Sequence, residues 1–371
     1  MTSFWKTLPR PIIGLSPMDG VTDHPFRHIQ KRHGNPALLF TEFVRVERLC
    51  AGEIKLLRAL LYDESQRPII AQVYGTKPEA FRQAAVLLCR LGFDGIDINM
   101  GCPSPGVADS GAGAGLILTP DLAVAIVAAT RAGVRDWQNG ATAWEQPGVA
   151  PAVAALVEER HAQLPPAFRQ PCPVPVSAKT RIGYANSQVD EWIPRLLESQ
   201  PAAISLHGRT LVQGYTGTAD WAAIGRAVEL ARGSGILLMG NGDVAHRGAA
   251  LARAADYGVD GVLIGRASYG NPFVFCAEIE ALEESSPETE RRLLARLSIA
   301  GEHAAIYEES LRGWSGYSFN FMHKHLRWYV QGLPGARHLR GELVRTTSAA
   351  DVKQVLERYF SSQMRQEESA A

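Results

Sequence analysis

Long hydrophobic segments are absent from this chain of 371 residues. No apolar run approaches the roughly 18–20 residues that a helix needs to span a bilayer, so we expect no membrane association. The first residues, Met1 to Lys6, also lack the apolar stretch of a secretory signal. Hydrophobic residues make up 46% of the sequence and charged residues 20%, which is typical of a globular protein. We therefore expect a cytoplasmic protein with one large domain and a smaller one.

Cysteine and lysine are both scarce. The five cysteines are odd in number and include no C-x-x-C pair, so the sequence predicts neither a disulfide framework nor a metal site. Only seven of the 38 basic residues are lysine, and 38 acidic residues balance them exactly in number. A chain with no net charge can still carry a basic face, because its charges can be unevenly distributed.

The clearest excess of positive charge lies between Leu311 and Arg345, where Glu342 is the only acid. The basic residues there are Arg312, Lys324, Arg327, Arg337, Arg340 and Arg345. Six aromatic residues and three histidines are interleaved with them. Basic side chains can position phosphates and aromatic rings can stack on unpaired bases, which favours RNA contact for the cations. For the aromatic residues we favour the alternative, that they form the core of a helical domain.

Eight short apolar runs recur along the chain, with segments of helical character between them. Continuous Val, Ile and Leu runs are typical of strands buried on both faces of a parallel sheet. The runs are Ile12–Ser16, Ala37–Glu42, Ile69–Val73, Gly95–Asn99, Val174–Ala178, Ala203–His207, Ile236–Gly240 and Gly261–Ile264. Their number and alternation predict an α/β fold, a (β/α)8 TIM barrel. A doubly wound open sheet is the alternative, but its G-x-G-x-x-G turn is missing.

The barrel is predicted to occupy residues 1–271, followed by a small helical domain over residues 272–371. Strands four and five are separated by more than twice the about 30 residues of one βα unit, so we expect an insertion over residues 136–172. Its middle, Val149 to Leu164, is a candidate helix. After Ile264 no buried strand signal remains, and helices are expected. Their ranges are Glu278–Glu284, Glu288–Glu309, Phe319–Gln331 and Ala350–Phe360.

Polar residues and glycines gather where the predicted strands end, which is where a barrel binds its ligands. In chain order they are Ser16, Pro17, Met18, Gln72, Asn99, Cys102, Lys179, Arg181, His207, Asn241, Gly242, Asp243, Gly265 and Arg266. The glycine turns after the last two strands let backbone N–H groups approach a phosphate, and Arg266 adds a bidentate donor. A lysine inside a barrel needs an anion, and a reduced flavin carries negative charge that suits Lys179. Gln72 offers a donor and an acceptor to the pyrimidine edge of that flavin.

Six segments in order on successive strands resemble one family, the tRNA-dihydrouridine synthases. They are Ser16–Arg27 (SPMDGVTDHPFR), Asp97–Leu116 (DINMGCPSPGVADSGAGAGL), Ala178–Gly183 (AKTRIG), Leu206–Gly214 (LHGRTLVQG), Gly240–Val244 (GNGDV) and Gly265–Arg266. The resemblance runs from Ser16 to about Arg345, apart from the insertion. It implies an FMN enzyme with a barrel and a C-terminal helical domain that binds tRNA. It also implies a monomer that reduces the C5–C6 double bond of specific uridines in tRNA to 5,6-dihydrouridine, with NADPH as the reductant.

The resemblance also implies roles for single residues. Ser16, Pro17 and Met18 would line the flavin through their backbone, and Gln72, Lys179 and His207 would contact its ring or ribityl chain. Asn241, Gly242, Asp243, Gly265 and Arg266 would hold the phosphate. Cys102 would be the catalytic acid and Asn99 would lie near the uracil, while Arg181, Arg327 and Arg340 would contact the substrate.

The residue types suit this chemistry. Reduction of uracil needs a hydride at C6 and a proton at C5, and a thiol of ordinary pKa is protonated at neutral pH and can donate that proton. A base inside a folded tRNA must be flipped out to reach the flavin.

Two departures from the family pattern lie beside the catalytic loop. Gly106 stands where a lysine is usual, and Asp109 where a basic residue is common. Two other functions remain open. One is a different FMN barrel reductase that acts on a small molecule, such as a dihydroorotate or enoate oxidoreductase. The other is an RNA-binding protein that has kept the scaffold but lost the chemistry.

Overall fold

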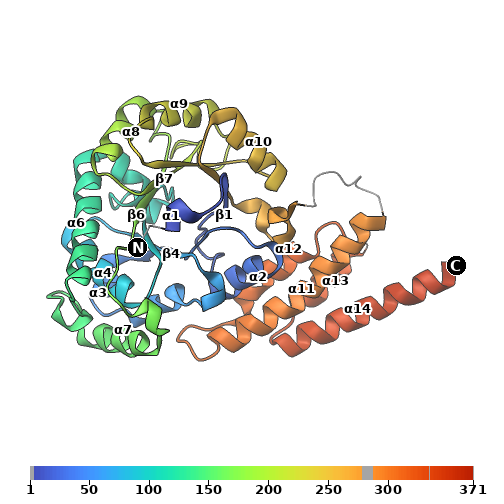
Figure 1. The fold of residues 1–371 in the computed structure, drawn as a ribbon. Helices are drawn as coiled ribbons and strands as arrows, with labels where there is room; N and C mark the ends of the chain where they lie inside the picture. The colour runs from blue at the N-terminus through green and yellow to red at the C-terminus, as the bar shows by residue number, and fades with distance from the viewer. Residues whose placement is uncertain (1–3, 278–286, 334, 371) are drawn as a thin grey trace.

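The computed structural model describes residues 4–277, 287–333 and 335–370. Within these ranges, nine parallel strands form one sheet in the order β1-β9-β8-β7-β6-β5-β4-β2, and β3 also pairs with β4. The two ends of this sheet are also hydrogen-bonded to each other. The Leu15 N–H of β1 donates to the Leu38 carbonyl, next to β2, and the Ala37 N–H donates to the Ile13 carbonyl of β1, each at 2.9 Å. The sheet is thus closed as a barrel (Figure 1). The predicted TIM barrel is confirmed, and the open sheet is excluded.

The strands agree with the eight apolar runs except at the second. They are β1 Ile12–Leu15, β2 Leu39–Phe40, β3 Val44–Arg45, β4 Ile69–Tyr74, β5 Gly95–Met100, β6 Val176–Arg181, β7 Ala203–His207, β8 Leu237–Asn241 and β9 Gly261–Ile264. The run Ala37–Glu42 is only briefly a regular strand, because at Thr41 the side-chain hydroxyl accepts the Gln72 N–H at 3.0 Å. The backbone pairing with β4 therefore breaks between β2 and β3.

Helices follow the strands and cover the outside of the barrel (Figure 1). They are α2 His24–Gly34, α3 Val46–Cys50, α4 Pro78–Arg90, α6 Pro120–Gln138, α8 Val189–Glu198, α9 Trp221–Ala231 and α10 Arg247–Tyr257. Among the described residues, no helix is both long and apolar enough to cross a membrane.

The inside of the barrel changes from apolar to polar along the strands. Side chains of a strand alternate between its two faces, so that every second residue points inward. Near the amino ends of the strands, Ile12, Ile70 and Met239 pack in a common cluster with Trp5 of α1 (Phe4–Thr7). Nearer the carboxyl ends, the paired positions Gln72 and Asp97, and then Asn99 and Lys179, are polar. One end of the barrel is therefore closed by apolar packing, and the other carries the functional groups.

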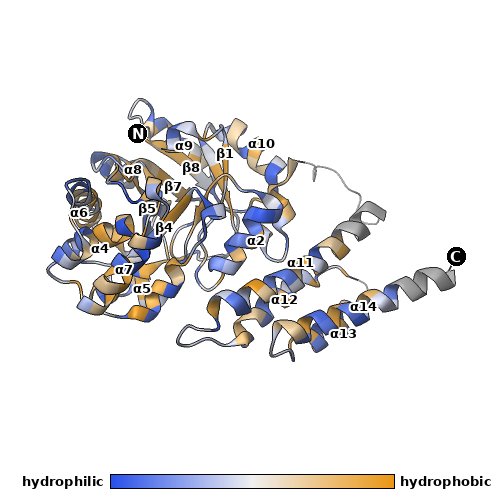
Figure 2. Cartoon of the chain, turned by 60° about the horizontal axis from the view of Figure 1, so that its bottom comes forward, coloured by the Kyte–Doolittle hydropathy of each residue, from blue (hydrophilic) through white to orange (hydrophobic). Residues whose placement is uncertain are grey.

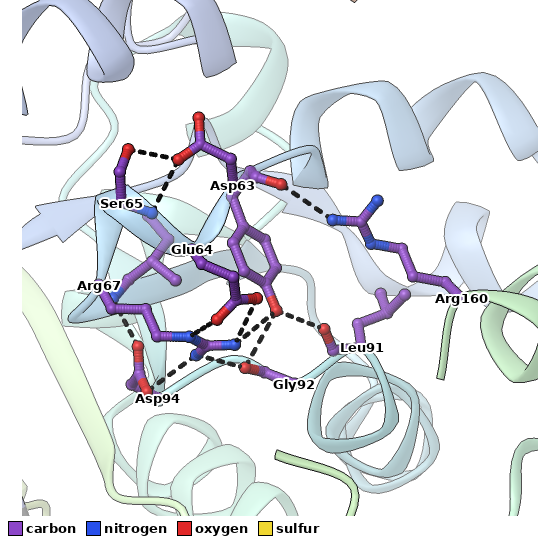
Figure 3. A network of polar contacts seen from close by, with 10 residues as sticks. Asp63, Glu64, Ser65, Arg67, Leu91, Gly92, Asp94 and Arg160 are labelled. Carbon is purple, nitrogen blue, oxygen red and sulfur yellow. Dashed lines mark hydrogen bonds and ion pairs between the residues drawn. The ribbon is translucent and has the colours of Figure 1, made fainter. Parts of the chain in front are cut away.

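The insertion contains α7 (Pro151–Gln163), where a helix was expected over 149–164. Arg160 of α7 donates to the Tyr62 carbonyl at 2.9 Å, and the Tyr62 hydroxyl donates to the Leu91 carbonyl at 2.8 Å. Arg67 extends this network by pairing with Asp94 at 2.9 Å (Figure 3). Arg67 and Asp94 precede β4 and β5, so these contacts of the insertion lie at the amino ends of the strands, away from the polar end.

The C-terminal helices pack around a core of their own. They are α11 Pro287–Leu311, α12 His323–Tyr329, α13 Ala336–Leu343 and α14 Ala349–Ala370. Ile29 of α2 is buried in the same cluster, so these helices lie against the barrel at α2 (Figures 1 and 2). In Figure 2, hydrophobic and hydrophilic residues alternate along α11 and α12, as expected for helices with one buried face.

Three details of the C-terminal region differ from the expectation or fall outside the description. The helix expected over 278–284 lies outside the described residues. The one expected over 319–331 begins as a 3-10 turn, Phe319–Met322, before α12. Helix α13 was not expected. Most of the aromatic residues are buried or partly buried in the core, as favoured above, but Phe321 remains 50% exposed.

Two histidines lie at the centre of the helical core. His303 of α11 and His325 of α12 are almost completely buried, with ring centroids 4.8 Å apart. Phe26 of α2 lies 5.4 Å from the His325 ring, so the pair also borders the barrel. Burial lowers the pKa of His303 to about 3 and the pKa of His325 well below its ordinary value. Both imidazoles are therefore neutral in the folded protein.

The neutral pair predicts a loss of stability in mild acid. Below about pH 6.5 the unfolded chain takes up a proton at each of these histidines and the folded chain does not, so the free energy of unfolding falls as the pH falls. For His303→Phe we expect the fall between pH 7 and pH 5.5 to be smaller than in the wild type by about 1 kcal/mol. Urea unfolding at the two pH values measures this difference. The control is His338→Phe, because the His338 side chain is 85% exposed; equal falls in both variants would contradict the prediction.

Candidate functional site

A cavity of about 800 Å³ lies at the carboxyl ends of the strands. This size is within the range of small-molecule and cofactor sites. Its lining includes every site residue expected at the strand ends: Ser16, Pro17, Met18, Gln72, Asn99, Cys102, Lys179, Arg181, His207, Asn241, Gly242, Asp243, Gly265 and Arg266. Arg327 and Arg340 lie elsewhere, exposed on α12 and α13. Closure of the barrel thus brings together the residues from the strand ends, and leaves the two surface arginines apart from them.

A chain of buried hydrogen bonds forms the floor of this pocket. The Gln72 amide donates to Asp97 at 2.8 Å, and the Asn99 amide donates to the Gln72 carbonyl oxygen at 3.0 Å. The Ser177 hydroxyl donates to the other Asp97 oxygen at 2.6 Å. Burial raises the pKa of Asp97 to about 6, although these hydrogen bonds and the charge of Lys179 oppose the shift. The orientation of the Gln72 amide is therefore set by Asp97 below it.

Asn99 holds the loop that carries Cys102. Its side-chain oxygen accepts the N–H groups of Gly101 at 3.1 Å and of Cys102 at 2.9 Å. Its side-chain nitrogen donates to Gln72, as described above. In this arrangement Asn99 fixes the backbone at Cys102 while it also lines the pocket.

Lys179 of β6 reaches past β7 to a residue of β8. Its ammonium donates to the Asn241 side-chain oxygen at 3.1 Å, and the Asn241 amide donates to the Leu263 carbonyl at 2.8 Å. Burial lowers the pKa of Lys179 to about 8, and the nearby charge of Arg181 adds to the shift. The lysine is therefore largely a cation at neutral pH, in a place where an anionic ligand would reduce the cost of its desolvation.

His207 lies in the same wall as a neutral group. Burial lowers its pKa to about 2, and the charges of Lys179, Arg181, Arg209 and Arg266 add to the shift. Its ring can donate or accept a hydrogen bond through either nitrogen, depending on the tautomer.

Cys102 is partly exposed to the pocket. Burial raises the pKa of its thiol, and the carboxylate of Asp19 adds to the shift, while Arg181 and Lys179 oppose it. The thiol is therefore neutral at physiological pH and available as a proton donor rather than as a thiolate nucleophile.

Arg181 joins the Cys102 loop to the loop that follows β7. Its Nε donates to the Gly101 carbonyl at 2.6 Å, and its Nη1 donates to the carbonyls of Thr210 and Gly214, both at 3.0 Å. The next residue, Tyr215, is 62% exposed and lines the pocket. The guanidinium carbon of Arg266 lies 5.2 Å from its ring centroid, within the range of a cation–π contact.

The end of the pocket near β8 and β9 has the character of an anion site. Gly242 has a φ of +131°, and a Cβ there would lie 2.6 Å from the Cβ of Ala219. Gly265 also lines the pocket, and a Cβ placed there would meet Met18 Sδ at 3.6 Å and Ser16 Cβ at 3.7 Å, which are ordinary contact distances. Arg266 lies beside both turns, with its Nη2 donating to Asp243 at 3.0 Å. Exposed backbone and a guanidinium at one place are the groups that bind phosphate.

Helix α12 borders the pocket from outside the barrel. Tyr269, which lines the pocket, stacks on Trp328 of α12 with ring centroids 4.0 Å apart and an angle of 15°. Lys324, also on α12, donates to the carbonyl of Gly20, next to the pocket residue Asp19. Arg327 is exposed on this same helix. Neither Arg327 nor Arg340 has an ion pair within the part of the chain that the structure describes.

The site also contains residues that the sequence analysis did not assign, four of which carry polar or aromatic side chains that the fold brings into it. Asp97 lies in the floor, and Phe43, Tyr215 and Tyr269 line the pocket. An acid in the middle of an apolar strand was a usable signal for Asp97. The three aromatic residues come from loops, and their direction depends on the fold. Gly106 is exposed with no atom within 4 Å of a Cβ placed on it, so packing does not exclude a lysine there.

The family comparison agrees with this geometry. The family model described as Dihydrouridine synthase (Dus) matches residues 14–137 and 154–365 of the chain. The interruption between the two matches falls within the insertion. The protein defined by this barrel and pocket is an oxidoreductase, and the chain belongs to the dihydrouridine synthase family. The resemblance seen in the sequence is thereby confirmed.

Relatives of similar length cover nearly the whole chain. A probable tRNA-dihydrouridine synthase of Staphylococcus aureus (strain COL) is 35% identical over 370 residues, covering 98% of this chain and 97% of the relative. The probable tRNA-dihydrouridine synthase 2 of Bacillus subtilis (strain 168) is 33% identical over 360 residues, covering 96% of each. Among solved structures, DHODH from Eimeria tenella in complex with ferulenol matches with a TM-score of 0.39 and 11% identity, covering 62% of this chain and 58% of that one.

The thiol environment predicts the reactivity of Cys102. We expect alkylation of Cys102 by iodoacetamide to accelerate only above the pH at which an ordinary thiol ionises, because burial and Asp19 disfavour the thiolate. Asp19→Asn removes one negative charge and should move the midpoint of the rate–pH profile down. Mass spectrometry of the modified peptide measures the rate at this cysteine alone. Glu53→Gln, outside the pocket, is the control; a profile that Asp19→Asn does not move would contradict the prediction.

Proposed function

We propose that the protein is an FMN-dependent enzyme that reduces the C5–C6 double bond of uridine in tRNA to give 5,6-dihydrouridine. The observation that carries this proposal is the joint position of Cys102, Lys179 and Arg266 in one pocket of a dihydrouridine synthase. The relatives above are described as probable tRNA-dihydrouridine synthases, which supports tRNA as the substrate. We further propose that the protein acts as a monomer in the cytoplasm, with NADPH as the reductant.

The order of charges along the pocket suits FMN. Arg266 and the turns at Gly242 and Gly265 form the end that would hold the phosphate. Lys179 and Gln72 are more deeply buried, and they would meet the isoalloxazine ring. Ser16 and Met18 line the pocket beside Gly265, and with Pro17 they would contact the flavin through their backbone. Lys179 would stabilise the negative charge that a flavin gains near N1 and O2 on reduction. The buried ammonium of Lys179, and the glycine turns beside Arg266 in the pocket lining, are the features of this chain that fit the group.

The protein residues would then perform the acid step of the reaction. Reduced FMN supplies the hydride for C6 of the uracil ring. Cys102 would donate the proton to C5, because its thiol is held neutral and its loop is fixed by Asn99. Arg181 lines the pocket beside the Cys102 loop, where its Nε binds the Gly101 carbonyl. From this position it would contact the substrate.

The C-terminal helices would bind the rest of the tRNA. A flipped uridine leaves an RNA surface that has to be held close to the pocket mouth. Helix α12 borders that mouth and exposes Arg327, and α13 exposes Arg340. These cations would bind phosphates, which orients the RNA without reading its sequence.

An anaerobic single-turnover experiment tests the proposed function. The flavin of the purified protein is reduced, unmodified tRNA is added, and reoxidation of the flavin is followed together with mapping of dihydrouridine. We expect reoxidation and a new dihydrouridine at a defined position. A protein that binds tRNA while its flavin stays reduced would instead support a loss of the chemistry, in line with the changes at Gly106 and Asp109.

The role of Cys102 predicts a separation of the two half-reactions. In Cys102→Ala, reduction of the flavin by NADPH should be unchanged, because the thiol takes no part in it. Reduction of uridine by the reduced flavin should slow by about 100-fold or more, which is the usual contribution of a positioned proton donor. Stopped-flow absorbance of the flavin follows both steps. The control is Cys172→Ala, a partly exposed cysteine outside the pocket lining; unchanged rates in both variants would exclude Cys102 as the acid.

The surface arginines predict a salt-dependent loss of tRNA affinity. We expect the double variant Arg327→Glu and Arg340→Glu to bind tRNA more weakly and with a flatter dependence on salt, because fewer counterions are released from the RNA. Titrations at several salt concentrations measure the slope. Arg135→Glu with Arg232→Glu is the control, since Arg135 is exposed on α6 and Arg232 is exposed directly after α9, both on the barrel. Equal affinity of the two double variants would remove this surface from the proposal.

A further inference from the structure

Asp243 connects three parts of the molecule at the phosphate end of the pocket. Its carboxylate accepts hydrogen bonds from Arg209 at 2.7 and 2.8 Å and from Arg266 at 3.0 Å. It also accepts the backbone N–H of Ala219 at 2.8 Å. The residue follows Gly242 and has itself a positive φ of 50°. A carboxylate at the end of the pocket that would hold a phosphate repels that phosphate, unless neighbouring positive charges compensate the negative charge of the carboxylate.

Arg209 is the buried partner of this carboxylate. Its side chain is only 2% exposed, whereas that of Arg266 is 49% exposed. Arg209 also donates to the carbonyls of Thr216 at 3.2 Å and Gly217 at 2.6 Å, in the loop that carries Tyr215. Its Nη1 is buried with no hydrogen-bond partner among the described residues. The guanidinium therefore keeps one nitrogen without a hydrogen bond, and its positive charge is fixed next to the carboxylate of Asp243.

The formal charges explain why two arginines share one carboxylate. With Arg209, Arg266 and Asp243 together, this end of the pocket carries one net positive charge. Without Arg209, the carboxylate would pair with Arg266 alone, and the net charge would be zero. Arg266 would then be held by Asp243 and would have to leave it in order to bind a phosphate.

We propose that Arg209 is a positioning residue that compensates Asp243 and so keeps Arg266 available for the phosphate of the cofactor. Arg209 does not line the pocket, so it acts through Asp243 rather than by contact with the ligand. Asp243 in turn orients the arginine and, through Ala219, fixes the end of the Tyr215 loop. Its carboxylate does not bind the phosphate. This inference rests on the proposed flavin site. It adds an explanation of how the site selects a phosphorylated flavin.

The test compares FMN with riboflavin, which has the same ring and no phosphate. Dissociation constants for both are measured on the flavin-free protein by quenching of flavin fluorescence. For Arg209→Gln we expect FMN to bind about tenfold or more weakly, as for the loss of one charge-assisted contact, with riboflavin little changed. The measured quantity is the ratio of the two constants, which a general loss of stability would not change.

A second substitution distinguishes charge compensation from a structural role. The double variant Arg209→Gln with Asp243→Asn has no carboxylate at position 243, so Arg209 is no longer required to compensate a negative charge. We therefore expect the preference for FMN over riboflavin to return. Asparagine keeps an oxygen for the Ala219 N–H. Asp243→Asn alone should keep or increase the preference. It also provides a readout if Arg209→Gln fails to fold.

The matched control is Arg67→Gln. Arg67 is 12% exposed and pairs with Asp94 and Glu64 (Figure 3), but it lies at the amino ends of the strands. We expect it to lower stability without changing the ratio. Equal weakening of FMN and riboflavin by Arg209→Gln, or no recovery in the double variant, would overturn the inference. If the wild-type protein bound neither flavin, the proposed function itself would fail.

Discussion

Burial of charge at the carboxyl ends of the strands is the constraint on which the rest of this site depends. Lys179 and Asp97 lie inside a closed barrel, where water cannot solvate them fully, so each needs partners of fixed position. Asp97 finds them in Gln72 and Ser177, and Lys179 in Asn241. Because Gln72 also holds Asn99, and Asn99 holds the backbone of Cys102, one buried carboxylate sets the geometry as far as the loop of Cys102. The pocket residues are therefore held in place by hydrogen bonds within the protein.

The insertion and the C-terminal helices contact the barrel at different distances from the pocket, as α7 and α12 show. Helix α7 is held through Arg160 to Tyr62 at the amino ends of the strands, the end of a barrel that contributes to stability rather than to ligand binding. Helix α12 meets the barrel at the mouth, through Lys324 and Trp328. A change in α7 is expected to act on folding, whereas a change in α12 is expected to act on the residues that line the pocket.

Much of the fold could be predicted from the sequence, because buried parallel strands are continuous apolar runs of a recognisable length. The exceptions have local causes. The second run is broken at Thr41, whose N–H still donates to the Ile70 carbonyl but whose hydroxyl, in place of its backbone carbonyl, accepts the Gln72 N–H. Helix α13 is short and begins after a glycine of positive φ, so it had little periodicity to detect. Residues at strand ends were predictable as a group, since the fold class places them together. The loop residues Phe43, Tyr215 and Tyr269 were not, because their direction depends on contacts distant in the sequence.

The stacking of Tyr269 on Trp328 has a consequence for how separable the two parts of the chain are. Tyr269 belongs to the segment after the last strand and forms a wall of the pocket, while its other face is covered by a ring from α12. A barrel isolated from its C-terminal helices would expose that aromatic face to water and lose the support of the wall. The wall of the pocket at Tyr269 therefore depends on the contact between the barrel and α12, and not on the barrel alone. A chimaera that joins this barrel to other C-terminal helices would need an aromatic ring in the place of Trp328.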